Sequence, residues 1–483
     1  MRQLFILSIL TTLLLAGCTK NITDFNNDPK KAVVVPAASL FVNGMKALSD
    51  NYINTGGGTA PFRFFAQTWT QNTYTTEARY ILSAYNAPDN WWAAMYGAVL
   101  NNLTQAKKLF VLGAPDAATL KNDLIITDIL QIYAYNLLVT TYGNIPYSQA
   151  ENDLVPFPKY DDAKTVYADL LTRLDTCIAG LNTAAGAMGN ADQIYKGNVT
   201  KWKKFAATLK LKMAMLLADT DPGTAGKKAQ EAVTAGVFTA NADNALLTYM
   251  ASPTGNTNPI WQALVNSGRH DNCPTNIMMD TMKKWNDPRI PLYFTKDLGG
   301  SGLYLGGVPG AGNSYFSLST FSDAWSSPTR PSDLLDYAEA EFLQAEAIER
   351  GFAVGGTAEQ HYNSGVTAAI QYWGGSAGDA TTYLAQPSVA YLTANGDYKQ
   401  KIGFQKWIAL ADRGWDAWTE IRRLKQPNLD LINPPVGASG AMPVRFYYPT
   451  TEQSSNPVNW AAAVKAMSGG ATDVVTTKLF WMP

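Results

Sequence analysis

Apolar residues recur at helical spacing along most of the chain after its first forty residues. In three long segments every third or fourth residue is apolar, which places these side chains on one face of a helix. The stripes are Ile126, Leu130, Tyr133, Ala134 and Leu137; Tyr167, Leu170, Leu171, Leu174, Ile178 and Leu181; and Trp202, Phe205, Leu209, Met213 and Leu216. Each stripe needs a partner helix to cover it. The pattern therefore predicts a mostly α fold.

Later helices carry small residues that let neighbours approach closely. A fourth stripe contains Leu335, Ala338, Phe342 and Ala345, and another helical stretch follows Gly351. Such helices are typical of helical-hairpin arrays, but the chain has no clean repeat of about 34 residues. We therefore expect a degenerate tetratricopeptide-like scaffold.

The helical pattern stops between Lys296 and Pro331, where Gly, Ser and Asn dominate. A long segment without periodicity inside a compact domain is usually functional or disordered. Its five rings argue against disorder: they are Tyr304, Tyr315, Phe316, Phe321 and Trp325. We expect folded loops on the helical scaffold, within a loop-rich region at about residues 241–335 of a single domain spanning residues 37–483.

At the N-terminus the residue types follow one another as they do in a secretory signal. Arg2 is followed by an apolar run from Leu4 to Leu15, and Ala16-Gly17 precede Cys18. This run is too short to span a bilayer. The small pair before a cysteine resembles the lipobox of bacterial lipoproteins, so residues 1–17 are predicted to be a lipoprotein signal peptide and Cys18 the lipid anchor. An ordinary secreted chain is the alternative.

Residues 18–36 are polar, contain two prolines and lack apolar periodicity, which favours an extended tether. No later apolar stretch approaches the roughly 20 residues of a spanning helix. We therefore expect a soluble domain that is attached to the membrane only through its lipid anchor.

Charge and histidine content exclude several functions. Lys+Arg 38 against Asp+Glu 39 gives a net charge of −1, so the chain lacks the basic surface that nucleic acid requires. His270 and His361 are the only histidines, which leaves no zinc-binding pair and little scope for acid–base catalysis. The sequence predicts no metal and no cofactor.

Other polar and thiol residues have structural explanations. Cys177 and Cys273 are expected to be free buried thiols, and a disulfide between them is the alternative. The basic residues Lys201, Lys203, Lys204, Lys210 and Lys212 are expected to form a solvated helix face. Glu339, Glu346 and Glu349 have the residue type of a glycosidase pair, but helix-surface and interhelical pairing explain them more simply.

Several segments, in order along the chain, resemble one family. They are Tyr142-Gly143-Asn144-Ile145-Pro146-Tyr147, Trp202-Lys203-Lys204-Phe205-Ala206, Asp287-Pro288-Arg289, Tyr337-Ala338-Glu339, and Gln405-Lys406-Trp407 with Trp418, Arg422-Arg423, Arg445 and Tyr448-Pro449. The chain resembles the SusD/RagB nutrient-binding outer-membrane lipoproteins, and more closely their branch described as starch-binding and associated with the outer membrane. Arg422 and Arg423 are expected to pair with Glu420 or with helix carbonyls rather than with a ligand.

The resemblance implies a non-catalytic binding protein in the outer membrane, lipid-anchored and facing the cell exterior. Such proteins form a lid on a SusC-like TonB-dependent barrel transporter and pass it nutrients, commonly glycans and sometimes peptides. Two alternatives stay open, a cell-surface glycan hydrolase and a helical scaffold that binds only protein partners.

The ligand site is predicted from rings in polar, loop-like sequence. A ring face stacks on the apolar face of a sugar while neighbouring amides and carboxylates bind its hydroxyls. The residues with this mix are Trp69, Gln71, Tyr74, Tyr315, Asp323 and Trp325. We expect some of these rings to be partly exposed, the alternative for each being burial in the core. Trp91 and Trp92 are expected to open a buried helix.

Overall fold

The structure is a computed structural model of the chain. It describes residues 35–56, 58, 60–113, 116–429, 434–469 and 472–483. The predicted signal peptide (residues 1–17), the predicted lipid anchor Cys18 and the tether as far as residue 34 lie outside the described residues.

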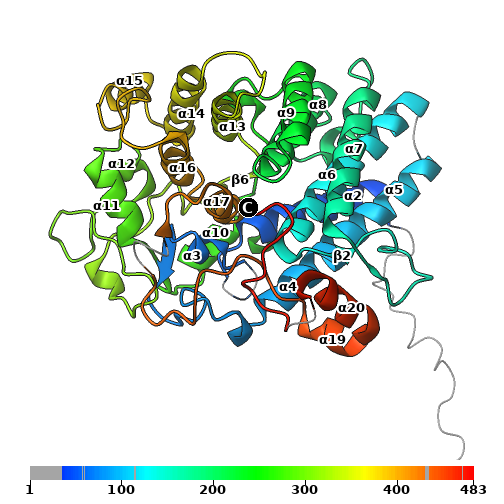
Figure 1. Ribbon diagram of the computed structural model, residues 1–483, viewed down its shortest axis with the longest axis horizontal. Coiled ribbons are helices and arrows are strands. Elements are labelled where there is room, and N and C mark those ends of the chain that lie inside the picture. Colours follow the sequence, from blue (N-terminus) through cyan, green and yellow to red (C-terminus); the bar gives the residue numbers. More distant parts are fainter. Residues whose placement is uncertain (1–34, 57, 59, 114–115, 430–433, 470–471) are drawn as a thin grey trace, which may run out of the picture.

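Helices make up most of the described chain, which confirms the mostly α prediction (Figure 1). Their bounds are α2 (Ala37–Ile53), α3 (Phe62–Phe65), α4 (Ala87–Ala93), α5 (Asn101–Gly113), α6 (Ala117–Tyr142), α7 (Ala163–Gly180), α8 (Val199–Leu216), α9 (Pro222–Ala235), α10 (Pro259–Trp261), α11 (Asn276–Lys284), α12 (Ile290–Tyr293), α13 (Tyr337–Glu349), α14 (Ala358–Tyr372), α15 (Ala377–Leu384), α16 (Tyr398–Ala409), α17 (Gly414–Leu424), α19 (Thr450–Ser455) and α20 (Pro457–Ser468). A π-helical stretch, Ala94–Leu100, joins α4 to α5 without a break.

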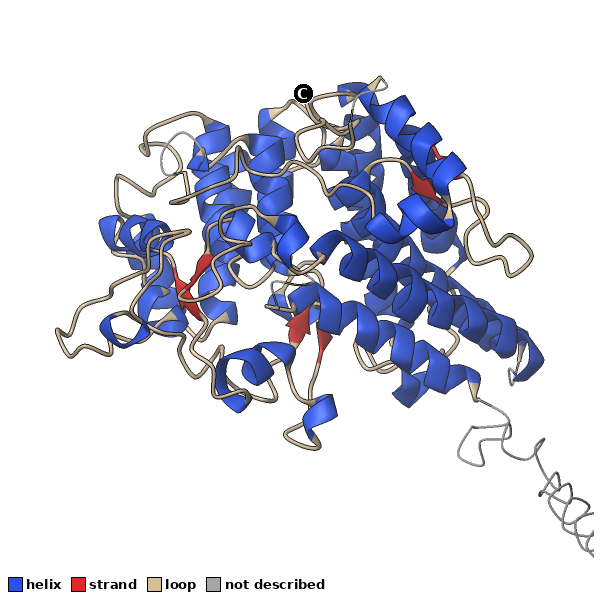
Figure 2. Ribbon diagram, turned by 90° about the horizontal axis from the view of Figure 1, so that it is seen from below, coloured by secondary structure: helices blue, strands red, loops and turns tan. Residues whose placement is uncertain are grey.

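Within the described residues the strands are short and form three separate antiparallel pairs, seen as small red arrows among the helices in Figure 2. β1 (Trp69–Gln71) pairs with β5 (Asn272–Pro274), β2 (Ile145–Pro146) with β3 (Tyr160–Asp161), and β4 (Leu246–Leu247) with β6 (Ser332–Asp333). These pairs fix loops to the scaffold at defined points and do not form a layer of their own.

Consecutive helices pack on one another as hairpins. α6 packs on α7, α8 on α9 and α13 on α14, while α7 also packs on α8 and α13 on α16. In Figure 1, α2 and α5–α9 lie on the right, α11, α12 and α14–α16 on the left, and α17 lies between them. The predicted stripes account for this arrangement, because their residues in α6, α7, α8 and α13 are buried. The expected helix after Gly351 is α14.

Capping residues mark where these helices begin. At the start of α7, Asp162 accepts the backbone N–H of Thr165, which satisfies one of the free donors of the helix. The carboxylate of its neighbour Asp161 accepts the N–H groups of Tyr147 and Ser148 and so holds the turn that follows α6. Asp116 caps α6 in the same way as Asp162 caps α7.

Helix α6 requires one correction to the sequence analysis. It is 26 residues long and apolar enough to cross a membrane by length and composition alone. However, most of its apolar stretch is buried inside the fold. Other helices, rather than lipid, cover its apolar surface, and α6 is the central core helix of the scaffold.

The basic face predicted on α8 is partly wrong. Lys210 and Lys212 are buried, at 4% and 7% exposure. Lys210 pairs with Asp175 and Glu231. Lys212 pairs with Glu339 of α13 and Asp416 of α17. Their charges are matched by acidic residues far along the chain, which helical spacing alone does not reveal.

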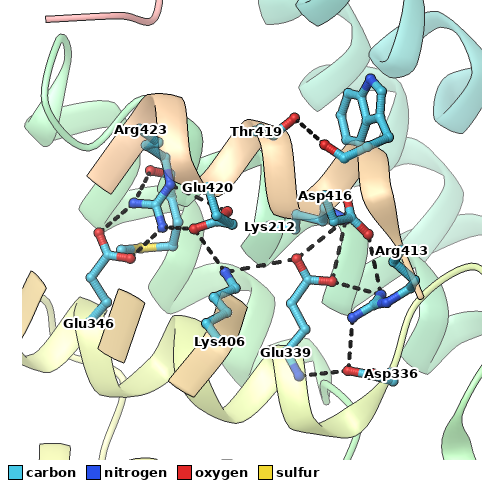
Figure 3. A network of polar contacts seen from close by, with 12 residues as sticks. Lys212, Asp336, Glu339, Glu346, Lys406, Arg413, Asp416, Thr419, Glu420 and Arg423 are labelled. Carbon is cyan, nitrogen blue, oxygen red and sulfur yellow. Dashed lines mark hydrogen bonds and ion pairs between the residues drawn. The ribbon is translucent and has the colours of Figure 1, made fainter. Parts of the chain in front are cut away.

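Lys212 belongs to a buried ion-pair network that joins α8, α13, α16 and α17 (Figure 3). Arg413 pairs with Glu339 at 2.9 Å and with Asp336 at 3.1 Å. The other members are Lys406, Glu420, Arg423 and Glu346. Burial alone would raise the pKa of Glu339, but the surrounding cations outweigh it and hold this pKa below its ordinary range. Glu339 therefore remains ionised inside the core.

The predicted pairing of the two C-terminal arginines is confirmed. Arg423 binds Glu420 and Glu346, while Arg422 donates to the carbonyls of Thr140 and Val444. Arg422 also lies between the rings of Trp418 and Trp481. Neither side chain is left free for a ligand anion.

The remaining sequence expectations about the core are met. Cys177 and Cys273 are free and buried, and burial raises the pKa of both thiols. Trp91 and Trp92 lie in α4 at 0% and 8% exposure, as expected for a buried helix start. The segment from Lys296 to Pro331 is folded, and Phe321 is buried against the scaffold.

Candidate functional site

The pairing of β1 with β5 brings two distant loop segments together. Trp69 lies opposite Pro274, Thr70 opposite Cys273, and Gln71 opposite Asn272. Beyond the strands, the N–H of Asn72 donates to the carbonyl of Asp271. The chain segments that lead away from this short ladder form the wall of the candidate site.

That site is a cavity of about 490 Å³, a size suited to a small-molecule or oligosaccharide ligand. Its wall comes from the segment after α2, from the chain between β1 and α4, and from the segment before β5. The lining residues are Thr55, Gly56, Gly58, Gln71, Tyr74, Glu77, Tyr85, Ala263, Ser267, Arg269, Asp271 and Asn272.

Two tyrosine rings are the exposed aromatic surface of the cavity. Tyr74 is 59% exposed and Tyr85 is 44% exposed. The Arg269 guanidinium lies over the Tyr74 ring at 5.2 Å. Tyr74 also has a φ of 53°, a left-handed conformation that non-glycine residues rarely adopt. Backbone strain of this kind persists where the surrounding structure holds it and is concentrated at ligand sites.

Charged and amide groups complete the wall. Arg269 forms an ion pair with Asp271, and Asp271 also accepts the hydroxyl of Thr73. The Gln71 amide donates to Glu77 at 2.9 Å and accepts the N–H of Ala78. These bonds fix the orientation of both side chains, so the polar part of the wall is preorganised.

Two of the predicted ligand-binding residues, Gln71 and Tyr74, lie on this wall. Tyr315 is half-buried and stacks on His270 with ring centroids 4.1 Å apart. His270 lies between Arg269 and Asp271, so Tyr315 contacts the segment that carries these two lining residues. The two segments that sequence analysis singled out thus meet through residues 269–271.

The expectation that the rings of Trp69 and Trp325 are partly exposed is wrong. They are 1% and 0% exposed and pack edge to face on each other, with Phe321 against both. The β1–β5 pairing turns Trp69 into the core, and the Arg330 guanidinium covers the Trp325 ring. Asp323 is exposed but does not line the cavity.

Sequence reasoning did not find Tyr85, Glu77, Arg269 and Asp271. Tyr85 carried a usable signal, because it stands in the polar stretch Ser83-Ala84-Tyr85-Asn86 before α4. For the charged residues no local signal exists, since only the strand pairing places them at one cavity.

The residues considered for catalysis have other roles. Glu339 and Glu346 lie within the buried ion-pair network, and Glu349 accepts the hydroxyl of Tyr391. In the described part of the chain no group of three His, Cys, Asp or Glu side chains is placed to hold a metal ion.

Comparison with known proteins agrees with this architecture. The sequence model of a family described as "Starch-binding associating with outer membrane" matches residues 29–449. A solved chitin-binding protein is 26% identical with a TM-score of 0.78, covering 92% of this chain and 99% of its own. A chitin-binding SusD homolog from Flavobacterium johnsoniae is 25% identical with a TM-score of 0.77, covering 92% and 98%. A search of the curated proteins finds no match.

A SusD-like protein from Bacteroides thetaiotaomicron is also 25% identical, with a TM-score of 0.76 and coverage of 92% of this chain and 99% of the other. Fold and cavity together define a helical-hairpin scaffold protein with a loop-built aromatic site. The chain belongs to the SusD-like family, whose members are associated with the outer membrane.

Proposed function

We propose that this protein is a non-catalytic oligosaccharide-binding protein that captures nutrient glycans at the outer membrane. The observation that carries the proposal is the cavity wall, where the exposed rings of Tyr74 and Tyr85 stand beside oriented polar groups. A ring face binds the apolar C–H face of a sugar, and amide or carboxylate groups bind its hydroxyls. The names of the family and of the chitin-binding relatives support the same ligand class.

The protein would pass its ligand to a SusC-like TonB-dependent barrel transporter. Support for this step comes from family membership, which implies a body that faces the cell exterior, and from the lipobox resemblance around Cys18, which implies a lipid anchor. A protein held beside its transporter raises the local concentration of captured ligand at the channel.

Binding without turnover distinguishes this proposal from a glycan hydrolase. Hydrolases of this kind need two carboxyl groups in acid and nucleophile or base roles. On the cavity wall, Asp271 is engaged by Arg269 and Thr73, and Glu77 is engaged by Gln71 and Thr76. The wall therefore favours a binding role.

The test is calorimetric titration of the purified protein with starch-derived and chitin-derived oligosaccharides, followed by chromatography of the same mixtures after long incubation. Saturable binding with intact ligand supports the proposal. Released shorter sugars would support the hydrolase instead. No binding to any glycan in a broad array would support the scaffold that contacts only protein partners.

A further inference from the structure

One acidic side chain on the cavity wall lacks a cationic partner. Glu77 is 1% exposed, and its Oε2 accepts hydrogen bonds from Gln71 Nε2 at 2.9 Å and Thr76 Oγ1 at 3.0 Å. Its Oε1 is buried and has no hydrogen-bond partner among the described residues. A buried carboxylate oxygen without a partner is costly, because it loses its bonds to water.

The other charges on the wall cancel. Arg269 is the one cation among the lining residues, all of which belong to the described chain, and it is paired with Asp271. Glu77 forms no ion pair within the described residues and therefore leaves the wall with one net negative charge. Charges beside a low-dielectric wall act more strongly than charges in water. Such a wall attracts a ligand cation and repels a ligand anion.

The exposed rings favour the same kind of ligand. Tyrosine faces carry negative charge density and attract ammonium groups as well as sugar C–H groups. An ammonium group also offers three hydrogen-bond donors together with a positive charge, whereas a hydroxyl offers one donor and no charge. An oligosaccharide with a free amine thus matches both the rings and the unpaired carboxylate.

We propose that the cavity selects oligosaccharides that carry a protonated amine, that is, amino sugars without the acetyl group, and that Glu77 determines this specificity. This inference rests on the proposed function, since it names the substrate class of the same site. A neutral glycan fills the cavity and stacks on the rings but leaves the charge of Glu77 unpaired. An acidic glycan is rejected by that charge.

The test compares three hexasaccharides of equal length by calorimetry: glucosamine, N-acetylglucosamine and glucose oligomers. At a pH where the amine is protonated, the glucosamine oligomer should bind about tenfold more tightly than the other two, the scale of one charge-assisted hydrogen bond. Raising the pH until the amine is deprotonated should remove this preference, because the ligand then carries no charge to pair with Glu77.

The key variant is Glu77→Gln. Its amide oxygen can accept the same two hydrogen bonds, so the variant should keep its fold while losing the preference for the amine oligomer over the glucose oligomer. Asp153→Asn is the matched control, because Asp153 is an exposed carboxylate that does not line the cavity. It should retain the full preference.

The outcomes separate the inference from the proposed function. Equal affinity for all three oligomers, or an unchanged preference in Glu77→Gln, overturns the amine selectivity while glycan binding stands. Binding of none of them overturns the amine selectivity, and the broad glycan array then decides the proposed function. If Glu77→Gln does not fold, the pH series on the unmodified protein decides, and a preference that persists once the amine is neutral overturns the inference.

Discussion

Gln71 on β1 lies directly opposite Asn272 on β5, and both residues line the same cavity. The register of this short ladder therefore decides which side chains reach the ligand. A shift of one residue would turn alternate side chains to the other side, because side chains alternate along a strand. The site depends on a pairing between segments that are remote in sequence.

Replacing the exposed rings should weaken binding without unfolding the protein. Tyr74→Ala and Tyr85→Ala should each reduce glycan affinity by ~1 to 3 kcal/mol, the scale of a well-placed aromatic contact. The thermal midpoint should stay nearly unchanged, because both rings are largely exposed. Calorimetry and thermal unfolding of the same samples measure the two effects. Unchanged affinity in both variants would place the ligand elsewhere.

Trp325→Ala, in contrast, should mainly lower the stability of the protein. The ring is fully buried against Trp69 and Trp373, so its removal leaves a cavity that costs about 3 to 5 kcal/mol of unfolding free energy. Denaturant unfolding measures this loss. A variant with wild-type stability would contradict the burial of this ring. Trp69→Ala should behave similarly.

The paired His361 should give stability a pH dependence. Burial favours the neutral ring, but the hydrogen bond and charge of Glu341, at 2.7 Å, outweigh burial and raise the pKa of His361 above 6.5. The charged ring is thus favoured in the folded state. Its contribution is complete below the unfolded pKa and is lost as the pH rises through the raised folded pKa.

Denaturant unfolding between about pH 5 and 9 measures how the free energy of unfolding changes with pH. The loss of stability should begin near the unfolded histidine pKa of about 6.5. His361→Gln should remove it, and Glu341→Gln should remove the same component. If the single variants and the double variant retain the wild-type slope, the pair does not control it.

Cys18→Ala should abolish lipidation. The protein should then be found in the soluble fraction or as an uncleaved precursor, because the run Leu15-Ala16-Gly17-Cys18 follows an apolar signal core. Membrane fractionation with mass determination of the N-terminal peptide measures this. Correctly processed Cys18→Ala protein in the membrane would contradict the prediction.

A stable complex with an outer-membrane barrel is expected from family membership. Affinity purification after mild detergent extraction should recover one large partner at near-stoichiometric yield. Recovery of no such partner, under conditions that keep a known barrel–lid pair intact, would argue against the delivery step but leave glycan binding untouched.

Sequence patterns predicted the scaffold well because its helices are built on local periodicity. The stripes at Ile126 to Leu137 and at Trp202 to Leu216 correspond to α6 and α8. Local pattern failed where long-range partners decide the outcome. Lys212 has a surface-like sequence but meets Asp416 and Glu339 in the core.

The candidate site was predictable in part for the same reason. Gln71 and Tyr74 were identified from polar sequence around rings, yet the same criterion selected Trp69, whose polar neighbour Thr70 is itself buried by the strand pair. A polar context indicates a loop but not which of its faces meets solvent. Arg269 and Glu77 reach the site only through tertiary structure.

The ion-pair network of Figure 3 also limits how this chain can change over time. Removing one member, such as Lys212 or Glu339, leaves an uncompensated charge in the core, a loss of about 3 to 5 kcal/mol that a marginally stable domain does not tolerate. Viable replacements must therefore come as matched pairs across two helices. Residues in the loops around the cavity can change one at a time. Ligand preference can therefore diverge while the ion pairs keep the four helices of the network in the same packing.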